Sequence, residues 1–169
     1  MSLLFNGCAA TQKVSGERPT IIEVPFFPQE TFQCGPAALA TVINYWYGKT
    51  GTAKSLTHDA IAGEIYSPSA RGVLGIDLEL YARKQGFQAR QIAGTIDELK
   101  NSLDKGIPPI VLVDYGFSLY QRNHFMVVKG YSDSALVVNS GRKESERIAN
   151  EDLLKVWEKT GYWMLLVMP

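Results

Sequence analysis

The sequence predicts an α+β domain in which a helical half is followed by a half of mostly antiparallel strands. The chain has 169 residues, 46% of them hydrophobic, which is enough to bury the core of one domain. Apolar residues with helical spacing fill the first part, and the β-rich runs "PPIVLVDY", "HFMVVKGY", "ALVVN" and "YWMLLVMP" fill the last part. We expect the two halves to pack against each other and to leave a groove between them.

The clearest single element is a helix over residues 36 to 47. Leu39, Val42, Ile43 and Trp46 recur at the i, i+3, i+4 and i+7 positions of a helix with one buried face. The segment begins with a proline, which suits the first turn of a helix, and a glycine follows it. We therefore expect this helix to start directly after a Cys-Gly pair.

Further helices are indicated by their capping residues. Thr57 is expected to cap a short helix, and Thr95 opens a capping box with the glutamate three residues later. A helix over residues 76 to 85 lies between these two. A last helix over residues 151 to 159, with Asn150 as its expected cap, precedes the final strand.

Charge and composition exclude several classes of function. The formal net charge is zero, which gives no support for a nucleic-acid partner or for binding to an anionic membrane surface. No run of 18 apolar residues is present, so we expect no transmembrane helix. The two cysteines and two histidines lack the spacing of metal ligands, so neither a metal nor another cofactor is predicted.

The N-terminal segment, residues 1 to 20, is predicted to be a flexible tail before a domain that spans residues 21 to 169. Its start, "MSLLFNGCAA", resembles the end of a bacterial lipoprotein signal, in which the cysteine after a small residue is lipidated. Cys8 is then the lipidation site, and the tail is a tether for an exported, membrane-anchored or periplasmic protein. The alternative interpretation is a tail without function.

The candidate nucleophile is Cys34, which comes directly before the predicted helix. Unpaired backbone N–H groups and the positive end of the helix dipole favour a thiolate at this position and lower its pKa. Of the two histidines, His58 lies in a polar first turn and is interpreted as a surface residue. His124 opens an apolar strand and is the candidate base, although a lone histidine there is also compatible with a structural role.

Two amides complete the candidate site. Gln29, five residues before the cysteine, is expected to contribute to an oxyanion hole. Asn139, at the end of the strand after His124, is expected to orient the imidazole. Gln33 and Asn123 compete with them by position.

These residues resemble a known family. The segments "PFFPQETFQCGPAALATVINYW" and "NHFMVVKGYSDSALVVN" are similar to the double-glycine-leader (bacteriocin-processing) peptidases, which are papain-like cysteine peptidases. The resemblance implies that Cys34 is the nucleophile, His124 the base and Gln29 the oxyanion residue. It places Asn139 at the orienting position, where the leader peptidases usually have aspartate and papain has asparagine.

The resemblance implies a peptide or protein substrate and no cofactor. The leader peptidases are commonly fused to membrane and ATPase domains, which this sequence lacks, so we expect a separate, exported peptidase. Two alternatives stay open. One is a deamidase or transpeptidase on the same Cys-His scaffold, and the other is a non-catalytic peptide-binding domain of an export or assembly system. The sequence does not predict the oligomeric state.

The strand pairing sets a condition on the proposed triad. A tight turn at Asp133-Ser134 would displace His124 from Asn139 by about three residues, or roughly 10 Å. A bulge, a longer loop or a bend is then required to bring the two side chains together.

Overall fold

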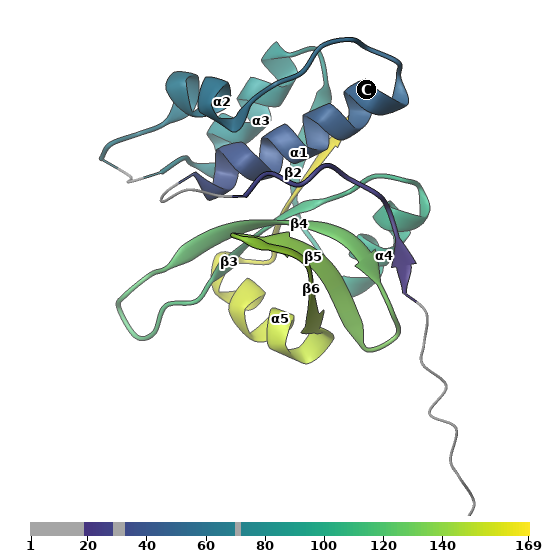
Figure 1. Ribbon diagram of the computed structural model, residues 1–169. Coiled ribbons are helices and arrows are strands. Elements are labelled where there is room, and N and C mark those ends of the chain that lie inside the picture. The colour runs from purple at the N-terminus through teal and green to yellow at the C-terminus, as the bar shows by residue number, and fades with distance from the viewer. Residues whose placement is uncertain (1–18, 29–32, 70–71) are drawn as a thin grey trace, which may run out of the picture.

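The protein is one antiparallel sheet with helices on both faces, seen in a computed structural model that describes residues 19–28, 33–69 and 72–169 (Figure 1). The helices are α1 (Cys34–Lys49), α2 (His58–Ile65), α3 (Gly75–Lys84), α4 (Ile96–Asp104) and α5 (Asn150–Trp157), which continues into the 3₁₀ helix η1 (Glu158–Thr160). The strands are β1 (Thr20–Ile21), β2 (Gln88–Ala93), β3 (Ile110–Asp114), β4 (Asn123–Tyr131), β5 (Ala135–Ser140), β6 (Lys143–Ala149) and β7 (Trp163–Met168).

The sheet is open, and its strand order is β2-β7-β3-β4-β5-β6. Every pairing in it is antiparallel, and the short strand β1 pairs separately with β4. In Figure 1, helices α1, α2 and α3 form a layer on one side of the sheet, and α5 lies on the other side. The predicted α+β class is therefore confirmed.

Side chains alternate along β4 between two hydrophobic cores. Phe125 and Val127 join the core that contains α1, whereas Met126 and Val128 join the core that contains residues of α4 and α5. This alternation follows from the two-residue repeat of a strand. Strand β4 is thus buried on both faces, which explains its continuous apolar sequence.

Helix α1 is buried more completely than a one-faced helix. Leu39, Val42 and Ile43 are fully buried as predicted, and the indole of Trp46 donates a hydrogen bond to the Val167 carbonyl at 2.8 Å. The alanines on its other faces are also buried. Small side chains there allow α2 and α3 to approach, so α1 becomes the central helix of its layer.

Two strands were not predicted, β2 and β6, and they are the two edges of the sheet. Their sequences, QARQIA and KESERIA, carry polar or charged residues at half or more of their positions. An edge strand with one solvent-facing side needs few apolar residues, so it gives no hydrophobic pattern to detect.

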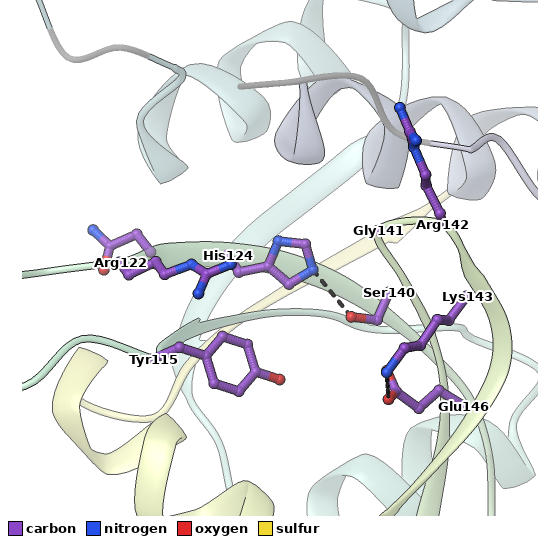
Figure 2. A pocket seen from close by; sticks show the side chains of 9 residues that line it. Tyr115, Arg122, His124, Ser140, Gly141, Arg142, Lys143 and Glu146 are labelled. Atoms are coloured by element: carbon purple, nitrogen blue, oxygen red, sulfur yellow. Dashed lines mark hydrogen bonds and ion pairs between the residues drawn. The ribbon is translucent and has the colours of Figure 1, made fainter.

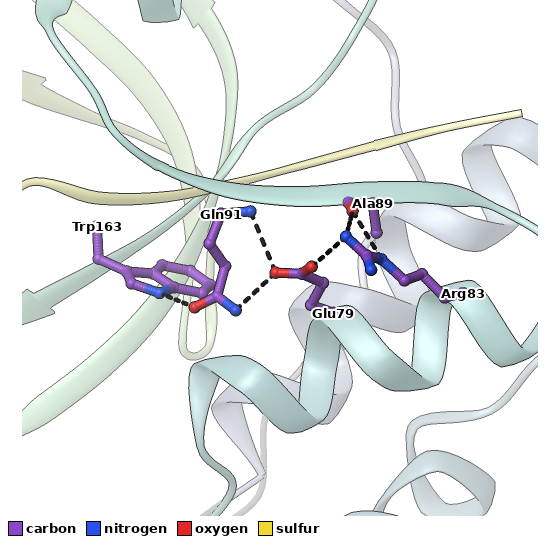
Figure 3. Close-up of polar contacts among 5 residues, drawn as sticks. All are labelled: Glu79, Arg83, Ala89, Gln91 and Trp163. Carbon is purple, nitrogen blue, oxygen red and sulfur yellow. Dashed lines mark hydrogen bonds and ion pairs between the residues drawn. The ribbon is translucent and has the colours of Figure 1, made fainter.

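Strand β2 is held in place by a polar network rather than by apolar packing alone (Figure 3). The carboxylate of Glu79 on α3 is nearly buried and pairs with Arg83. It also accepts hydrogen bonds from the backbone and the side chain of Gln91, at 3.2 and 2.7 Å. Gln91 in turn accepts from the Trp163 indole. Because every partner is satisfied, the buried charge can be tolerated.

The capping predictions are mostly confirmed. The Thr57 hydroxyl accepts from the Ala60 amide, and the Thr95 hydroxyl accepts from the Glu98 amide. Asn150 was wrong as a cap, because it forms the first residue of α5 and donates from its side chain to the Asp133 carbonyl at 3.0 Å. Within the described residues, no helix combines the length and the apolar character needed to cross a bilayer.

The first turn of α1 packs so closely that only glycine fits at position 35. A methyl group on Gly35 would collide with a methyl group of Val73 and would lie 3.2 Å from the Phe125 ring. Phe125 directly follows His124 on β4. The absence of a side chain at Gly35 therefore allows the start of α1 to reach the start of β4.

We predict that Gly35→Ala destabilises the fold by about 1–3 kcal/mol, because the added methyl overpacks this contact. Gly48→Ala is the matched control in the same helix, since nothing lies within 4 Å of a methyl group there. The control is expected to be neutral or to stabilise by up to about 1 kcal/mol. Urea unfolding of both variants tests this, and equal effects would contradict the proposed close contact.

Candidate active site

Cys34 is the first residue of α1, which begins two residues earlier than the predicted residue 36, and its thiol is free. The main-chain groups of Phe125, Gly35 and Cys34 itself lie near enough to the sulfur to lower the pKa of the thiol. Two of these groups belong to the first turn of α1, where backbone N–H groups lack helical partners. The third belongs to β4, so the sulfur lies where the helix meets the strand that carries His124.

The net effect on the thiol differs from the expectation. Burial raises the pKa of Cys34 above its ordinary value, and the three main-chain groups only partly offset this. The helix terminus does favour the thiolate, as reasoned from the sequence, but the loss of water around the sulfur is the larger effect. The resting site therefore holds a protonated thiol at neutral pH.

His124 lies at the second position of β4 and is largely enclosed. Its Nε2 atom forms a hydrogen bond with the Ser140 hydroxyl at 3.1 Å (Figure 2). Burial and the positive charge of Arg122 lower the pKa of His124, and the negative charge of Glu146 opposes them. The imidazole is therefore neutral at pH 7.

The His124 ring lies on the strand that meets the first turn of α1, but in the described part of the chain it forms no hydrogen bond with the Cys34 sulfur. Among the described residues, the hydrogen bond that the His124 ring makes is the one to Ser140, and no hydrogen bond joins it to Cys34. Catalytic hydrogen bonds are often long in unliganded sites and shorten when substrate binds. A direct contact between the Cys34 sulfur and the His124 ring stays a prediction.

Among the described residues no hydrogen bond joins Asn139 to His124, in contrast to the predicted orienting contact. It pairs across the sheet with Val127, three residues from the histidine. Its side-chain oxygen accepts from the Ser145 amide at 3.1 Å, and its side chain is almost fully buried. A bulge occurs between Val128 and Gly130, but the offset of three residues remains.

The next residue takes the position expected for Asn139. Successive side chains of a strand point to opposite faces, so Ser140 is directed away from the side of Asn139. A second bulge, between Val138 and Ser140, lies where β5 leaves its regular pairing with β6. The sequence contained one indication that another residue contacts the histidine. The predicted displacement of about three residues between His124 and Asn139 meant that Asn139 would not lie opposite His124 in a regular hairpin.

The remaining predicted residues have different outcomes. Gln29 and Cys8 lie outside the described residues, so the oxyanion and lipidation assignments stay predictions. Gln33 donates from Nε2 to an Asp59 carboxylate oxygen at 3.3 Å. Asn123 is exposed at the start of β4.

His58 was wrongly interpreted as a surface residue. Its side chain is only 20% exposed, and its ring packs near that of Phe27 with a centroid distance of 6.3 Å. Its Nε2 atom lies 3.6 Å from a carboxylate oxygen of Asp59.

A cavity of about 460 Å³ opens beside His124, between the β3–β4 and β5–β6 hairpins (Figure 2). Its lining includes the side chains of Tyr115, Arg122, His124, Ser140, Lys143 and Glu146. Most of these residues were not singled out from the sequence, because polar hairpin residues carry no distinctive pattern. No cluster of potential metal ligands occurs in the described parts of the chain.

The connection between β3 and β4, which forms one wall of this cavity, is stabilised by the side chain of Asp114. A carboxylate oxygen of Asp114 accepts from the amides of Gly116 and Arg122, both at 2.7 Å. These hydrogen bonds, that from Arg122 foremost, lower the pKa of Asp114. The two hydrogen bonds also fix the backbone of Arg122 two residues before the histidine.

Comparison with known proteins identifies the family of this chain. Residues 21–164 match the Peptidase_C39-like family. The chain belongs to this family. The search of curated proteins found no match. The C39 relationship confirms the predicted family, and it supports a cysteine peptidase of the papain-like type.

Solved C39 structures share the fold. A candidate C39-like peptidase from Bacillus anthracis is 17% identical, and the match covers 90% of this chain and 98% of that one with a TM-score of 0.73. The peptidase domain of Streptococcus ComA, a bifunctional ABC transporter of a quorum-sensing pathway, is 24% identical over 88% and 98% of the two chains, with a TM-score of 0.69. A double-glycine-motif protease of an AMS/PCAT transporter, solved with its leader peptide, is 23% identical over 88% and 94%, also with a TM-score of 0.69.

The raised pKa of Cys34 predicts slow alkylation of this C39-family protein near neutral pH. An ordinary cysteine is only a few per cent thiolate at pH 7, and Cys34 is less ionised still. Because iodoacetamide reacts with the thiolate, its rate at Cys34 is expected to rise with pH, with a midpoint above that of an ordinary thiol. A Cys8→Ser background confines the reaction to Cys34, and a fast reaction with a midpoint near pH 6 would contradict the prediction.

Asn139→Ala is predicted to lower stability rather than to act on the imidazole. It removes the acceptor of the Ser145 amide, which costs about 1–3 kcal/mol if that amide stays buried. Asn139→Asp keeps an acceptor and is the control. Thermal unfolding measures the loss of stability, and an NMR titration of His124 is expected to give an unchanged pKa. A shift of one pKa unit or more in Asn139→Ala would restore Asn139 as the orienting residue.

Proposed function

We propose that this protein is a cysteine peptidase that hydrolyses a peptide bond with Cys34 as nucleophile and His124 as general base and acid. The observation that carries the proposal is the contact between the first turn of α1 and β4, where Gly35 packs against Phe125. It joins a thiol at a helix N-terminus to the residue directly after the histidine. A buried structural cysteine needs neither of these neighbours.

The first half-reaction transfers the acyl group to sulfur. Neutral His124 accepts the thiol proton while the sulfur attacks the peptide carbonyl. The carbonyl oxygen becomes an oxyanion, which the Cys34 amide and the predicted Gln29 side chain stabilise. The intermediate then collapses, the C–N bond breaks, and His124 gives its proton to the leaving amine. The product of this stage is a thioester on Cys34.

The second half-reaction releases the acyl group. His124 removes a proton from water as the water oxygen attacks the thioester carbonyl. The thiolate leaves and takes the proton back from the imidazolium, which restores the starting thiol and neutral ring. No metal or other cofactor is required for either half.

The uncharged resting pair sets the pH dependence of this scheme. A neutral imidazole is needed to accept the thiol proton, so kcat/KM is expected to fall on acidification through the pKa of His124. That pKa is lowered mainly by burial, so the acidic limb is expected below the pH at which an ordinary histidine titrates. A site that depended on a preformed thiolate–imidazolium pair would lose activity as pH rises through the histidine pKa.

A quenched fluorescent peptide library, with products analysed by mass spectrometry, tests the activity. Cys34→Ala and His124→Ala are expected to abolish cleavage. Gln29→Ala is expected to lower turnover by about 10² to 10³, the cost of one oxyanion donor, with Gln33→Ala as the neighbouring control. A Gln33→Ala variant that loses activity while Gln29→Ala does not would move the oxyanion role.

The products also separate the alternatives. Two fragments whose masses add up to substrate plus water show hydrolysis. Conversion of a side-chain amide to an acid in an intact peptide would show a deamidase, and joining of an acyl fragment to an added amine would show a transpeptidase. Binding of library peptides without any change in mass would favour a non-catalytic peptide-binding domain.

A further inference from the structure

The hydrogen bond between His124 and Ser140 determines which nitrogen of the His124 ring can accept a proton, a choice that the proposed mechanism does not specify. A general base needs one ring nitrogen with a free lone pair, and the hydrogen bond at the other nitrogen decides which one that is. Nε2 of His124 lies 3.1 Å from the Ser140 hydroxyl oxygen. In Figure 2 the other ring nitrogen is directed away from Ser140.

We propose that Ser140 is the positioning residue of His124, and that it holds the imidazole with a neutral hydroxyl in place of a carboxylate or an amide. This inference rests on the proposed peptidase function. Nε2–H donates to the serine oxygen, so the proton of the neutral ring stays on Nε2. The lone pair of Nδ1 is then free to accept the proton of the Cys34 thiol.

A serine hydroxyl both donates and accepts, so something must direct its own hydrogen away from the ring. Glu146 is the acidic residue in the lining of the cavity beside His124 and Ser140. One of its carboxylate oxygens accepts from Lys143 at 2.6 Å, which holds the group at the cavity wall. The negative charge of Glu146 is thus fixed in the wall of the same cavity, where it favours a serine hydrogen turned away from His124.

The charges around the ring agree with a neutral resting pair. The titratable groups that line the cavity with His124 are Tyr115 and Arg122 from the β3–β4 hairpin, and Arg142, Lys143 and Glu146 from the β5–β6 hairpin. Burial keeps Tyr115 protonated by raising its pKa. In the cavity lining, Glu146 thus carries the negative charge, and Arg122, Arg142 and Lys143 carry positive charges.

A carboxylate at position 140 would change this balance. An opposite charge next to an imidazole favours the imidazolium, so it would raise the pKa of His124. An imidazolium near the sulfur would in turn favour the thiolate. Serine lacks this effect, so the proton moves from sulfur to ring only during the attack on substrate.

The test is an NMR titration of the ring. The chain contains two histidines, so a His58→Gln background leaves His124 as the one titrating imidazole. If the serine oxygen accepts from Nε2–H, it favours the imidazolium, and Ser140→Ala is expected to lower the His124 pKa. A rise in that pKa would show that the hydroxyl donates to Nε2, which would overturn the proposal.

Substitutions at the same position separate positioning from packing. Ser140→Thr keeps the hydroxyl and is expected to retain kcat/KM within about twofold, whereas Ser140→Ala is expected to lose about tenfold, the value of one hydrogen bond. Ser140→Asp is expected to raise the His124 pKa and to move the alkylation midpoint of Cys34 to lower pH. The proposal would be contradicted if Ser140→Thr had a kcat/KM no higher than that of Ser140→Ala. It would also be contradicted if Ser140→Asp shifted neither the His124 pKa nor the alkylation midpoint of Cys34.

Arg122→Gln is the matched control for charge. It removes a cation that lowers the His124 pKa but leaves the Ser140 hydrogen bond in place. It is expected to raise the His124 pKa without a tenfold loss of kcat/KM. The NMR and alkylation measurements need no substrate, so they test Ser140 even if the peptidase assay fails.

Discussion

The close contact between the first turn of α1 and the start of β4 determines the rest of the site. Glycine at position 35 permits this contact, because a side chain would meet Val73 and Phe125. The contact brings the main chain of Phe125 near the Cys34 sulfur, where it lowers the pKa of the thiol. One small residue thus joins the helical layer to the sheet at the point where the reactive groups lie.

The same contact explains why the thiol is not ionised at rest. A helix terminus stabilises a nearby negative charge by about 0.3–1 kcal/mol when exposed. Full burial shifts a pKa by up to about 3–5 units, and each unit is worth about 1.4 kcal/mol. Tight packing brings main-chain groups near the sulfur and also removes its water, and for Cys34 the second effect is larger.

The sequence allowed the α+β class, the helix after Cys34 and the family to be predicted, because periodic apolar residues and the Cys-Gly pair are local signals. It did not reveal β2 and β6, whose polar edge positions carry no such signal. Asn139 was assigned the wrong contact because a strand places neighbouring residues on opposite faces, and bulges change the register. The choice between Asn139 and Ser140 depends on geometry across two hairpins, which spacing along the chain does not determine.

The hydrophilic edges of the sheet also bear on how the protein behaves at high concentration. An open sheet exposes unpaired backbone groups at its outer strands, where a second chain can add by β-pairing. On β6, charges of both signs lie close together, at Lys143, Glu144, Glu146 and Arg147. A second copy that added in the usual antiparallel way would have to desolvate these charges. The composition that hides this strand from pattern analysis therefore also protects the folded protein against edge-to-edge aggregation.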